Sequence, residues 1–327
     1  MADAEDLKSS GDFSSCGFDS HPGHHCVSCS QSMASARRKE FMRRGFSTLC
    51  ISCLLIGAAA CALLSPAQEP RSTPTYLGFD LNTYPGDDAL PILRKTFSFA
   101  GYWLNPPPGA KQSNWVGKRQ LLLAQKFGFL LLYNGPLIAE LKSPAQATKR
   151  GTTDAASAAA AAKKEGFPLH VIIFLDIEEG GRLSENYHAY LRAWADGLGR
   201  AAYRPGVYCS GMPASEGHGV TIITADDIRA NLGKRELAYF VYNDACPPSH
   251  GCVISRNPPA PSASGVSYAA VWQFAQSPRR KQFTAHCAAT YNHDGNCYAP
   301  GDSAHAWFLD LNSATTPDPS SGRGEGQ

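Results

Sequence analysis

The pentapeptide Phe174-Leu175-Asp176-Ile177-Glu178 decides the fold more than any other stretch of the chain. It completes an apolar run over residues 171–175, a pattern typical of a strand buried on both faces. Side chains alternate along a strand, so Asp176 and Glu178 are expected on the same side, with Cα atoms roughly 6.5 Å apart. The stretch therefore predicts a central strand of an α/β fold that ends in two neighbouring acids.

Two acids side by side at the end of a buried strand repel each other and lose water. The pKa of one of them then rises while the other stays ionised, so that one site holds both a proton donor and an anion at neutral pH. The alternative is structural: a pair of carboxylates satisfied by helix N-termini or by an arginine, because ionised acids are rarely buried without partners.

Short apolar segments alternate with helical or loop segments from residue 76 onward. Four segments between them have the amphipathic or alanine-rich pattern of helices, at residues 117–127, 153–165, 184–198 and 225–232. This alternation predicts a single-domain (β/α)8 TIM-type barrel over residues 74–312. The predicted strands are residues 76–81, 97–104, 129–133, 170–175, 206–209, 237–242, 269–274 and 307–311.

Barrel enzymes build their sites from the loops that follow the strands, so the last polar residues of the strands give a list of candidates. Four acids among aromatic and amide side chains suit a sugar, which stacks on rings and fills its polar edges with hydrogen bonds. Any one of these aromatics could equally be core packing, so the prediction of a ligand cleft depends on the whole set. The candidates are Asp80, Tyr133, Asn134, Asp176, Glu178, Tyr208, Ser210, Tyr242, Asn243, Trp272, Gln273, Asp310 and Asn312.

Five short motifs occur in the order seen in glycoside hydrolase family 25, the lysozyme-like muramidases. The chain resembles more closely the exported glycoside hydrolase-like barrel domains of bacterial proteins, which are related to that family. The resemblance covers about residues 74–312. The motifs are Gly78-Phe79-Asp80, Asp176-x-Glu178, Tyr208-x-Ser210-Gly211, Trp272-Gln273-Phe274 and Leu309-Asp310-Leu311-Asn312.

The resemblance implies an exported hydrolase that acts on peptidoglycan or another polysaccharide and needs no cofactor. Glu178 is similar to the general acid and Asp176 to its ionised neighbour, while Asp80 and Asp310 are similar to acids that shape the sugar subsite. Other substrate contacts are expected from Tyr133, Tyr208, Tyr242, Trp272 and Gln273.

Two other classes of function fit the same residues. One is a barrel of the cell envelope that binds a glycan without cleaving it, because a fold and two acids do not prove turnover. The other is a metal-assisted hydrolase with Asp80, Asp176, Glu178 and Asp310 around a divalent cation. No histidine follows any of those predicted strands, which disfavours the metal-assisted reaction.

The N-terminal region predicts export. Arg43-Arg44-Gly45-Phe46 resembles a twin-arginine signal, and an uncharged stretch over residues 47–64 ends in the small residues Ser65-Pro66-Ala67. Residues 42–67 are therefore predicted to be a signal peptide, with an uncleaved membrane anchor and a lipoprotein attached through Cys61 as alternatives. Each would place the barrel in the periplasm, in the cell wall or outside the cell, with the membrane touched only through this segment.

The two ends of the chain lack a core-forming pattern. Residues 1–41 are polar and predicted to be disordered, or else not translated if the true start is Met33 or Met42. Cys26 and Cys29 with nearby histidines offer zinc ligands, but no second cysteine pair follows at a finger-like spacing. Residues 313–327 are predicted to be a disordered tail.

Cysteine usage and charge restrict the partners. Cys246/Cys252 and Cys287/Cys297 are each close in sequence and predict two local disulfides in an oxidising compartment, with Cys209 left as a buried thiol. The formal net charge is +2, without a basic run past the leader that would suit a nucleic acid. Nucleic acid is therefore not expected as a partner.

Overall fold

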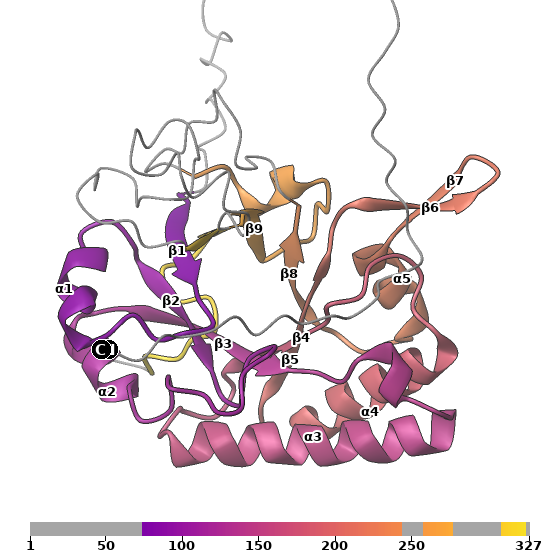
Figure 1. Cartoon of the computed structure of the whole chain (residues 1–327), viewed down its shortest axis with the longest axis horizontal. Coiled ribbons are helices and arrows are strands. Elements are labelled where there is room, and N and C mark those ends of the chain that lie inside the picture. Colours follow the sequence, from indigo (N-terminus) through magenta and orange to yellow (C-terminus); the bar gives the residue numbers. More distant parts are fainter. Residues whose placement is uncertain (1–73, 244–257, 277–308, 325–327) are drawn as a thin grey trace, which may run out of the picture. The chain divides into compact units, whose positions relative to one another are not determined.

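The computed structural model describes residues 74–243, 258–276 and 309–324 (Figure 1). The chain divides into two compact units, Met1–Gln68 and Glu69–Gln327, and every described residue belongs to the second. The predicted leader, signal segment and zinc ligands lie outside the described residues, as do the four cysteines of the predicted disulfides. Cys209 is a buried free thiol, as predicted.

Eight strands form a closed barrel in the order β1-β10-β9-β8-β5-β4-β3-β2, which confirms the predicted α/β barrel. Neighbouring strands are parallel, except that β10 runs antiparallel to both β1 and β9. The strands are β1 Tyr76–Asp80, β2 Phe99–Trp103, β3 Gly128–Asn134, β4 Ile172–Asp176, β5 Arg204–Ser210, β8 Ala238–Tyr242, β9 Val271–Ala275 and β10 Asp310–Ala314.

Helices cover the outside of the barrel (Figure 1). The longest, α3, begins at Pro144 rather than at residue 153, because Ser143 caps it by accepting a hydrogen bond from the Gln146 backbone N–H at 3.3 Å. The α-helices are α1 Leu90–Leu93, α2 Arg119–Ala124, α3 Pro144–Lys164, α4 Glu185–Arg200 and α5 Thr224–Asn231. Single turns of 3-10 helix are η1 Asp87–Ala89, η2 Ile138–Glu140 and η3 Pro261–Ser264.

The starts of α4 and α5 differ. Ser184 caps α4 by accepting a hydrogen bond from the Tyr187 backbone N–H at 3.2 Å. In α5, Ile223 is the N-cap residue, and the buried Thr224 hydroxyl has no hydrogen-bond partner. The Asp227 carboxylate of α5 bonds to the Leu183 N–H, to the His188 ring and, within the helix, to the Asn231 amide.

Helices α3 and α4 lie side by side because small residues let their backbones approach. A Cβ atom added at Gly151 of α3 would lie 2.3 Å from the Tyr190 carbonyl oxygen. One added at Gly197 of α4 would lie 2.6 Å from the Ala155 Cβ atom. The alanine-rich sequence of α3 is therefore a packing face against α4 (Figure 1).

Residues 213–223 form a β-hairpin that is not among the predicted strands. Its strands, β6 Pro213–Gly217 and β7 Val220–Ile223, pair antiparallel outside the barrel. The turn is made by His218 and Gly219, both in the left-handed region with φ of 50° and 76°. Figure 1 shows the hairpin projecting from the barrel on the side of α5.

The C-terminal segment is ordered through residue 324, so the prediction of a disordered tail is wrong for residues 313–324. The Phe129 backbone N–H donates to the Asp318 carboxylate at 2.7 Å, and the Leu131 N–H donates to the Ser320 hydroxyl at 2.8 Å. The Ile172 N–H donates to the Ser320 carbonyl at 3.0 Å. The segment thus pairs with backbone groups along β3 and at the start of β4. It is held by these hydrogen bonds, although its sequence lacks a hydrophobic pattern.

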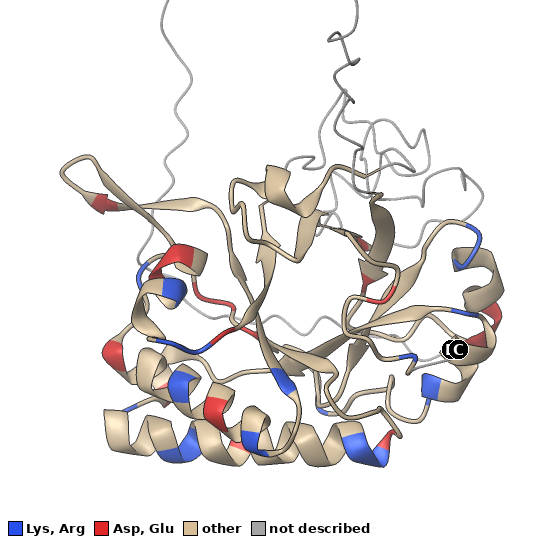
Figure 2. Ribbon diagram, turned by 180° about the vertical axis from the view of Figure 1, so that it is seen from behind, with Lys and Arg blue, Asp and Glu red and all other residues tan. Residues whose placement is uncertain are grey.

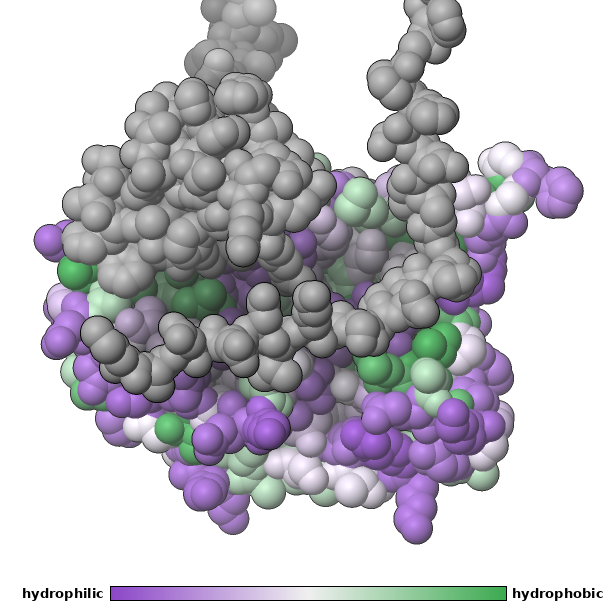
Figure 3. Space-filling view, in the orientation of Figure 1, coloured by the Kyte–Doolittle hydropathy of each residue, from purple (hydrophilic) through white to green (hydrophobic). Residues whose placement is uncertain are grey.

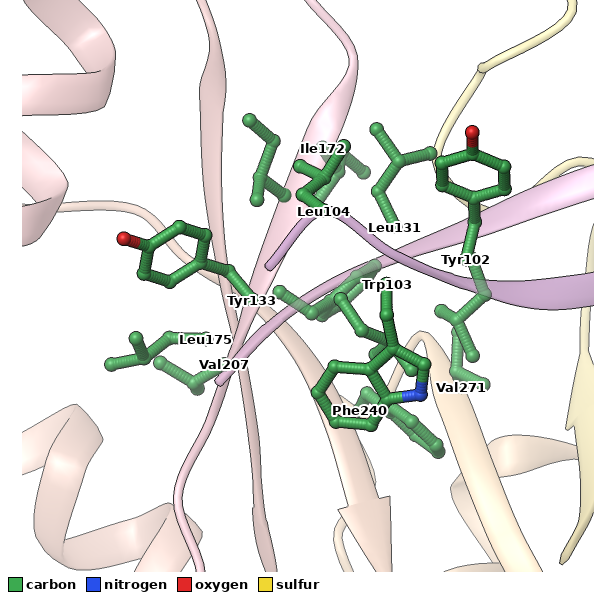
Figure 4. Close-up of a cluster of buried hydrophobic side chains, with 14 of the residues drawn as sticks. Tyr102, Trp103, Leu104, Leu131, Tyr133, Ile172, Leu175, Val207, Phe240 and Val271 are labelled. Atoms are coloured by element: carbon green, nitrogen blue, oxygen red, sulfur yellow. The ribbon is translucent and has the colours of Figure 1, made fainter. Parts of the chain in front are cut away.

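The core consists of large apolar side chains inside the barrel and between the strands and helices (Figure 4). On the visible face, described surface residues are largely hydrophilic, with scattered apolar patches (Figure 3). Within the described ranges, no helix has both the length and the apolar character needed to span a bilayer.

Candidate active site

Because side chains alternate along β1 and β4, the acids at the ends of these strands point into the barrel. Phe79 packs against the rings of Phe97 and Phe127, with centroids 5.0 and 6.2 Å away, on the helical side of β1. Asp80, the next residue, therefore faces the interior, because successive side chains point to opposite faces. In the same way Asp176 shares the inner face of β4 with Phe174.

Asp310 lies at the same end of the barrel as Asp80, but its position in its strand differs from the sequence prediction. It begins β10 instead of ending it, and β10 runs antiparallel to its neighbours. The start of β10 therefore lies at the end of the barrel where the parallel strands finish, and Asp310 is the Cα partner of Asp80. Asp310 is half-buried, and Asp80 is only 6% exposed.

Asp80 is held by two side-chain amides. Its Oδ2 atom accepts hydrogen bonds from Gln273 Nε2 at 3.0 Å and from Asn312 Nδ2 at 2.8 Å. The other end of Gln273 is also fixed, since its Oε1 atom accepts from the Tyr208 hydroxyl at 2.7 Å and from Gln276 Nε2 at 3.2 Å. Both amides thus donate to one oxygen of Asp80 and fix the position of its carboxyl group.

The pair Asp176 and Glu178 differs in depth. Asp176 is 4% exposed, and Glu178 is exposed to solvent. Burial raises the pKa of Asp176 well above its ordinary value, and the charge of Glu178, the charge of Asp80 and a hydrogen bond with Glu178 raise it further. The sequence predicted Asp176 as the ionised member of the pair, whereas its burial favours keeping a proton on Asp176.

Tyr208 lies where the four acids converge. Burial raises the pKa of its phenol, and the negative charges of Asp176, Asp80, Asp310 and Glu178 raise it further. Acids from β1, β4 and β10 and from the segment after β4 therefore act on a single side chain of β5. We call these four acids and Tyr208 the barrel mouth; Figure 2 shows acidic residues on the strands and loops of the barrel.

Tyr242 and Gln273 also belong to this end of the barrel. Tyr242 is the Cα partner of both Ser210 and Gln273 and is half-buried. It lies two residues after Phe240, whose ring packs 4.6 Å from that of Tyr208, and so it shares the inner face of β8. Both residues are thus placed where the sequence predicted substrate contacts.

Tyr133 and Trp272 are not at the barrel mouth, contrary to the sequence prediction. Tyr133 packs against Trp194 of α4, with ring centroids 5.4 Å apart, and burial raises the pKa of its phenol to about 12. Trp272 packs against Phe274, and its indole donates to the Asn243 carbonyl at 2.8 Å. Each side chain lies on the outer face of its strand, because the neighbouring residue in sequence takes the inner face.

Trp103 is a residue of this end of the barrel that the list of strand ends left out. It ends β2 and shares a face with Gly101, whose added Cβ atom would lie 2.5 Å from the Asp80 Cβ. The indole is 4% exposed, and its nitrogen has no hydrogen-bond partner. The position could have been found from sequence by including β2 among the strand ends and then counting alternate residues.

The segment that carries Glu178 is held by hydrogen bonds to several other parts of the barrel. The Ile177 N–H donates to the Tyr208 carbonyl at 3.1 Å, and the Leu183 N–H donates to the Asp227 carboxylate at 3.0 Å. Arg182 makes two hydrogen bonds to Glu216 of the β6–β7 hairpin, at 2.7 and 2.8 Å. These bonds restrict the loop after β4 although it contains no helix or strand.

Glu179 is a further acid in this loop, and its side chain makes a further hydrogen bond that holds the loop. Its carboxylate accepts a hydrogen bond from the Ile138 backbone N–H in the turn after β3. Burial is the largest cause of its raised pKa. Within the described ranges, no three or more His, Cys, Asp or Glu side chains are grouped so that they could hold a metal ion. What the described side chains of the mouth offer is proton transfer and hydrogen bonding.

Comparison with known proteins gives one family match and several similar solved structures. Residues 117–236 match the protein family described as Rv2525c-like, glycoside hydrolase-like domain, and no curated protein matches the chain. Among solved structures, an uncharacterized protein of B. stearothermophilus is 18% identical, with 73% of this chain and 95% of that chain covered and a TM-score of 0.46.

Two further solved structures are similar to the chain at low identity. The Tat-secreted protein Rv2525c of Mycobacterium tuberculosis is 16% identical, over 75% of this chain and 97% of that chain, with a TM-score of 0.42. GHIP, a glycosyl hydrolase 25 of Streptococcus pneumoniae, is 13% identical, over 72% of this chain and 86% of that chain, with a TM-score of 0.43. Over residues 117–236 the chain is therefore similar to the Rv2525c-like, glycoside hydrolase-like domain.

Proposed function

We propose that the barrel is a glycoside hydrolase that acts on peptidoglycan or another glycan of the cell envelope. The observation that carries the proposal is the pairing of a buried carboxyl, Asp176, whose pKa is raised, with the exposed carboxyl of Glu178. Such a pair supplies a proton donor and an anion at one place. The match to a glycoside hydrolase-like domain supports the same class of reaction.

In the proposed reaction Glu178 protonates the leaving glycosidic oxygen. Without substrate, the proton lies on Asp176, which is hydrogen-bonded to Glu178. A glycan that covers Glu178 removes water from it and so favours its protonated form, and the proton passes along that hydrogen bond. The C1–O bond then breaks, and the anions left at Asp176 and Asp80 stabilise the positive charge of the oxocarbenium-like transition state.

Water completes the reaction by adding its oxygen to C1, and its proton returns to the carboxylate pair. Tyr208 already donates to Gln273, so its hydroxyl oxygen is left to accept from a sugar hydroxyl. Tyr242 lies on the same inner face, and with Tyr208 it is proposed to orient the polar edges of the sugar.

A second candidate is a glycan-binding barrel without turnover. The observation in its favour is that burial keeps the proton on Asp176, while the group exposed to a substrate is Glu178. If a bound glycan does not draw that proton to Glu178, the mouth binds sugars without cleaving them.

We also propose that the protein is exported, to the periplasm, the cell wall or the medium. This rests on the sequence Arg43-Arg44-Gly45-Phe46 and the uncharged residues 47–64 that follow it. Fractionation of cells that express the chain, with and without Arg43→Lys and Arg44→Lys together, tests it. Retention of both proteins in the same compartment argues against export by that signal.

One comparison tests the hydrolase proposal. Purified protein and its Glu178→Gln variant are incubated with peptidoglycan, and new reducing ends and sedimented protein are both measured. Reducing ends made by the parent but not by Glu178→Gln support hydrolysis. Sedimentation with the glycan and no reducing ends supports the binding candidate. Glu236→Gln, an exposed acid just before β8 and therefore at the opposite end of the barrel, is the matched control and is expected to keep full activity.

A further inference from the structure

Trp103 is placed on the inner face of the barrel by the residues around it. Phe99 and Gly101 share its face of β2, since alternate residues point the same way. A Cβ atom added at Gly78 would lie 2.1 Å from the Phe99 ring, and one added at Gly101 would lie 2.5 Å from the Asp80 Cβ. Both contacts are made on the inner face of the barrel wall, so Trp103 lies on that face two residues beyond Gly101, the neighbour of Asp80.

The other side chains near Trp103 form the floor of the mouth. Figure 4 shows the indole in a cluster of buried side chains that also contains Phe240 and Val271. Phe240 packs against Tyr208, with ring centroids 4.6 Å apart, and Tyr208 bonds to Gln273. The backbone of Trp103 is fixed as well, because the Ser113 hydroxyl donates to its carbonyl oxygen at 2.9 Å.

The indole nitrogen of Trp103 lacks the partner that comparable groups have. Trp115 donates to the Leu81 carbonyl at 2.9 Å, and Trp272 donates to the Asn243 carbonyl at 2.8 Å. Trp103 is 4% exposed, and its N–H has no partner. A buried donor without a partner costs free energy, and so it calls for a physical explanation.

Trp194 shows that a buried indole N–H without a partner can also occur away from any binding site. Its indole nitrogen is buried and unpartnered too, but it lies in α4 against Tyr133, on the outer side of β3. A ligand in the barrel mouth has no access to that place. The two residues therefore differ in location and not in hydrogen bonding, and Trp194 is the natural control.

We infer that Trp103 is a binding residue of the barrel mouth, whose N–H donates a hydrogen bond to a hydroxyl or carbonyl oxygen of the bound glycan. The inference rests on the proposed function and assigns one contact within it. Because so little of the ring is exposed, stacking of a sugar on its face is excluded in this arrangement, and the N–H is the group that can contribute. The nitrogen is enclosed in the unliganded protein, so this contact requires the surrounding side chains to move when a sugar reaches the floor of the mouth.

The test uses the indole N–H signals of the full chain in ¹H–¹⁵N spectra. The Trp103 signal is assigned by its loss in Trp103→Phe, and the Trp194 signal by its loss in Trp194→Phe. Each protein is titrated with the tetrasaccharides of β-1,4-linked N-acetylglucosamine, glucosamine and glucose. The three sugars distinguish a carbonyl acceptor, present only in the first, from a hydroxyl acceptor, present in all.

The expected result is that the Trp103 signal moves on saturation while the Trp194 signal does not. Trp103→Phe keeps the ring in place of the indole, loses the donor and is expected to bind about tenfold more weakly, as for one lost hydrogen bond. Trp194→Phe is expected to bind like the parent. If Trp103→Phe does not fold, assignment through Trp115→Phe, Trp194→Phe, Trp272→Phe and Trp307→Phe still identifies the Trp103 signal in the parent, because the chain has five tryptophans.

Two outcomes overturn the inference in different ways. If a tetrasaccharide binds but the Trp103 signal stays unmoved, or Trp103→Phe binds as tightly as the parent, the contact is wrong and the proposed function stands. If the parent binds none of the three sugars and no peptidoglycan, the proposed function fails and this contact fails with it.

Discussion

Asp80 of β1 and Asp310 of β10 are Cα partners in the antiparallel ladder that closes the barrel. In an all-parallel barrel the last strand would carry Asp310 to the rim at its carboxyl end. Here the reversed strand starts at the rim, and Asp310 faces the mouth because paired residues of two strands share a face. The reversal also sets Asn312 beside Gly78, where its amide reaches Asp80 at 2.8 Å.

Replacing Asp80 by asparagine is expected to destabilise the protein. Asparagine has one uncharged oxygen and one NH2 group in place of the two carboxylate oxygens. The donating amides of Gln273 and Asn312 therefore face either an uncharged acceptor or another donor. The loss of two hydrogen bonds to a buried carboxylate is expected to lower the free energy of unfolding by about 1–3 kcal/mol. Urea unfolding measures this; the exposed Asp88→Asn serves as control, and equal losses in the two variants would refute the role given to the amides.

Asp176 is expected to make stability depend on pH. A carboxyl whose folded-state pKa is raised binds its proton more tightly in the folded protein, so stability falls as the pH rises from the ordinary aspartate pKa toward the folded value. Asp176→Asn mimics the protonated form and removes this fall. The unfolding free energy of the variant, relative to the parent, is expected to increase with pH by up to about 1.4 kcal/mol per unit across that window.

Chemical unfolding of both proteins between pH 4 and 8 (roughly the range from the ordinary aspartate pKa upward) checks this expectation. Parallel stability curves for parent and Asp176→Asn would mean that Asp176 titrates alike in the folded and unfolded chain. The burial of Asp176 would then not have the electrostatic effect described here.

The barrel and most of its mouth could be predicted because they depend on local sequence. Apolar runs mark the strands, and acids that follow them mark the rim, so Asp80, Asp176 and Asp310 are found without coordinates. The errors come from side-chain direction: Tyr133 faces outward against Trp194, and Trp272 faces away from its neighbour Gln273, which bonds to Asp80. A count of alternate residues from Gln273 would have excluded Trp272. The end of β2 was not considered, and so Trp103 was missed.

Other features depend on contacts between distant parts of the chain and leave no local pattern. The direction of β10 is set by its pairing with β1 and β9, and the order of residues 313–324 is set by bonds to β3 and β4. Likewise the raised pKa of Asp176 follows mainly from its burial. Sequence places both acids on one face and does not reveal which is buried.

The C-terminal segment is expected to contribute to stability through Ser320. Ser320→Ala removes the hydroxyl that accepts from the Leu131 N–H, and this buried donor is then left unpaired, at a cost of about 1–3 kcal/mol. Thermal or urea unfolding measures the loss. Thr315→Ala, an exposed position in the same segment, is expected to change little, and an equally small change in Ser320→Ala would contradict the structural role of the segment.

Arg182 and Glu216 are expected to be energetically coupled. They join the loop that carries Glu178 to the β6–β7 hairpin through two hydrogen bonds, but the Arg182 side chain is 57% exposed, so solvent weakens the pair. A small favourable coupling is expected from a double-mutant cycle of Arg182→Ala and Glu216→Ala. Charge reversal of both residues together should restore part of what either reversal loses, and strictly additive losses would show that the hairpin does not hold the loop.

The most direct measurement of the central claim is the titration of the Asp176 carboxyl, followed by ¹³C NMR in the parent and in Glu178→Gln. The proposed proton sharing predicts an Asp176 pKa above the ordinary aspartate value, and a lower one in Glu178→Gln, because the charge and hydrogen bond of Glu178 are then gone. An ordinary Asp176 pKa in both proteins would contradict it, since the mouth would then hold no carboxyl able to store a proton for the glycosidic oxygen.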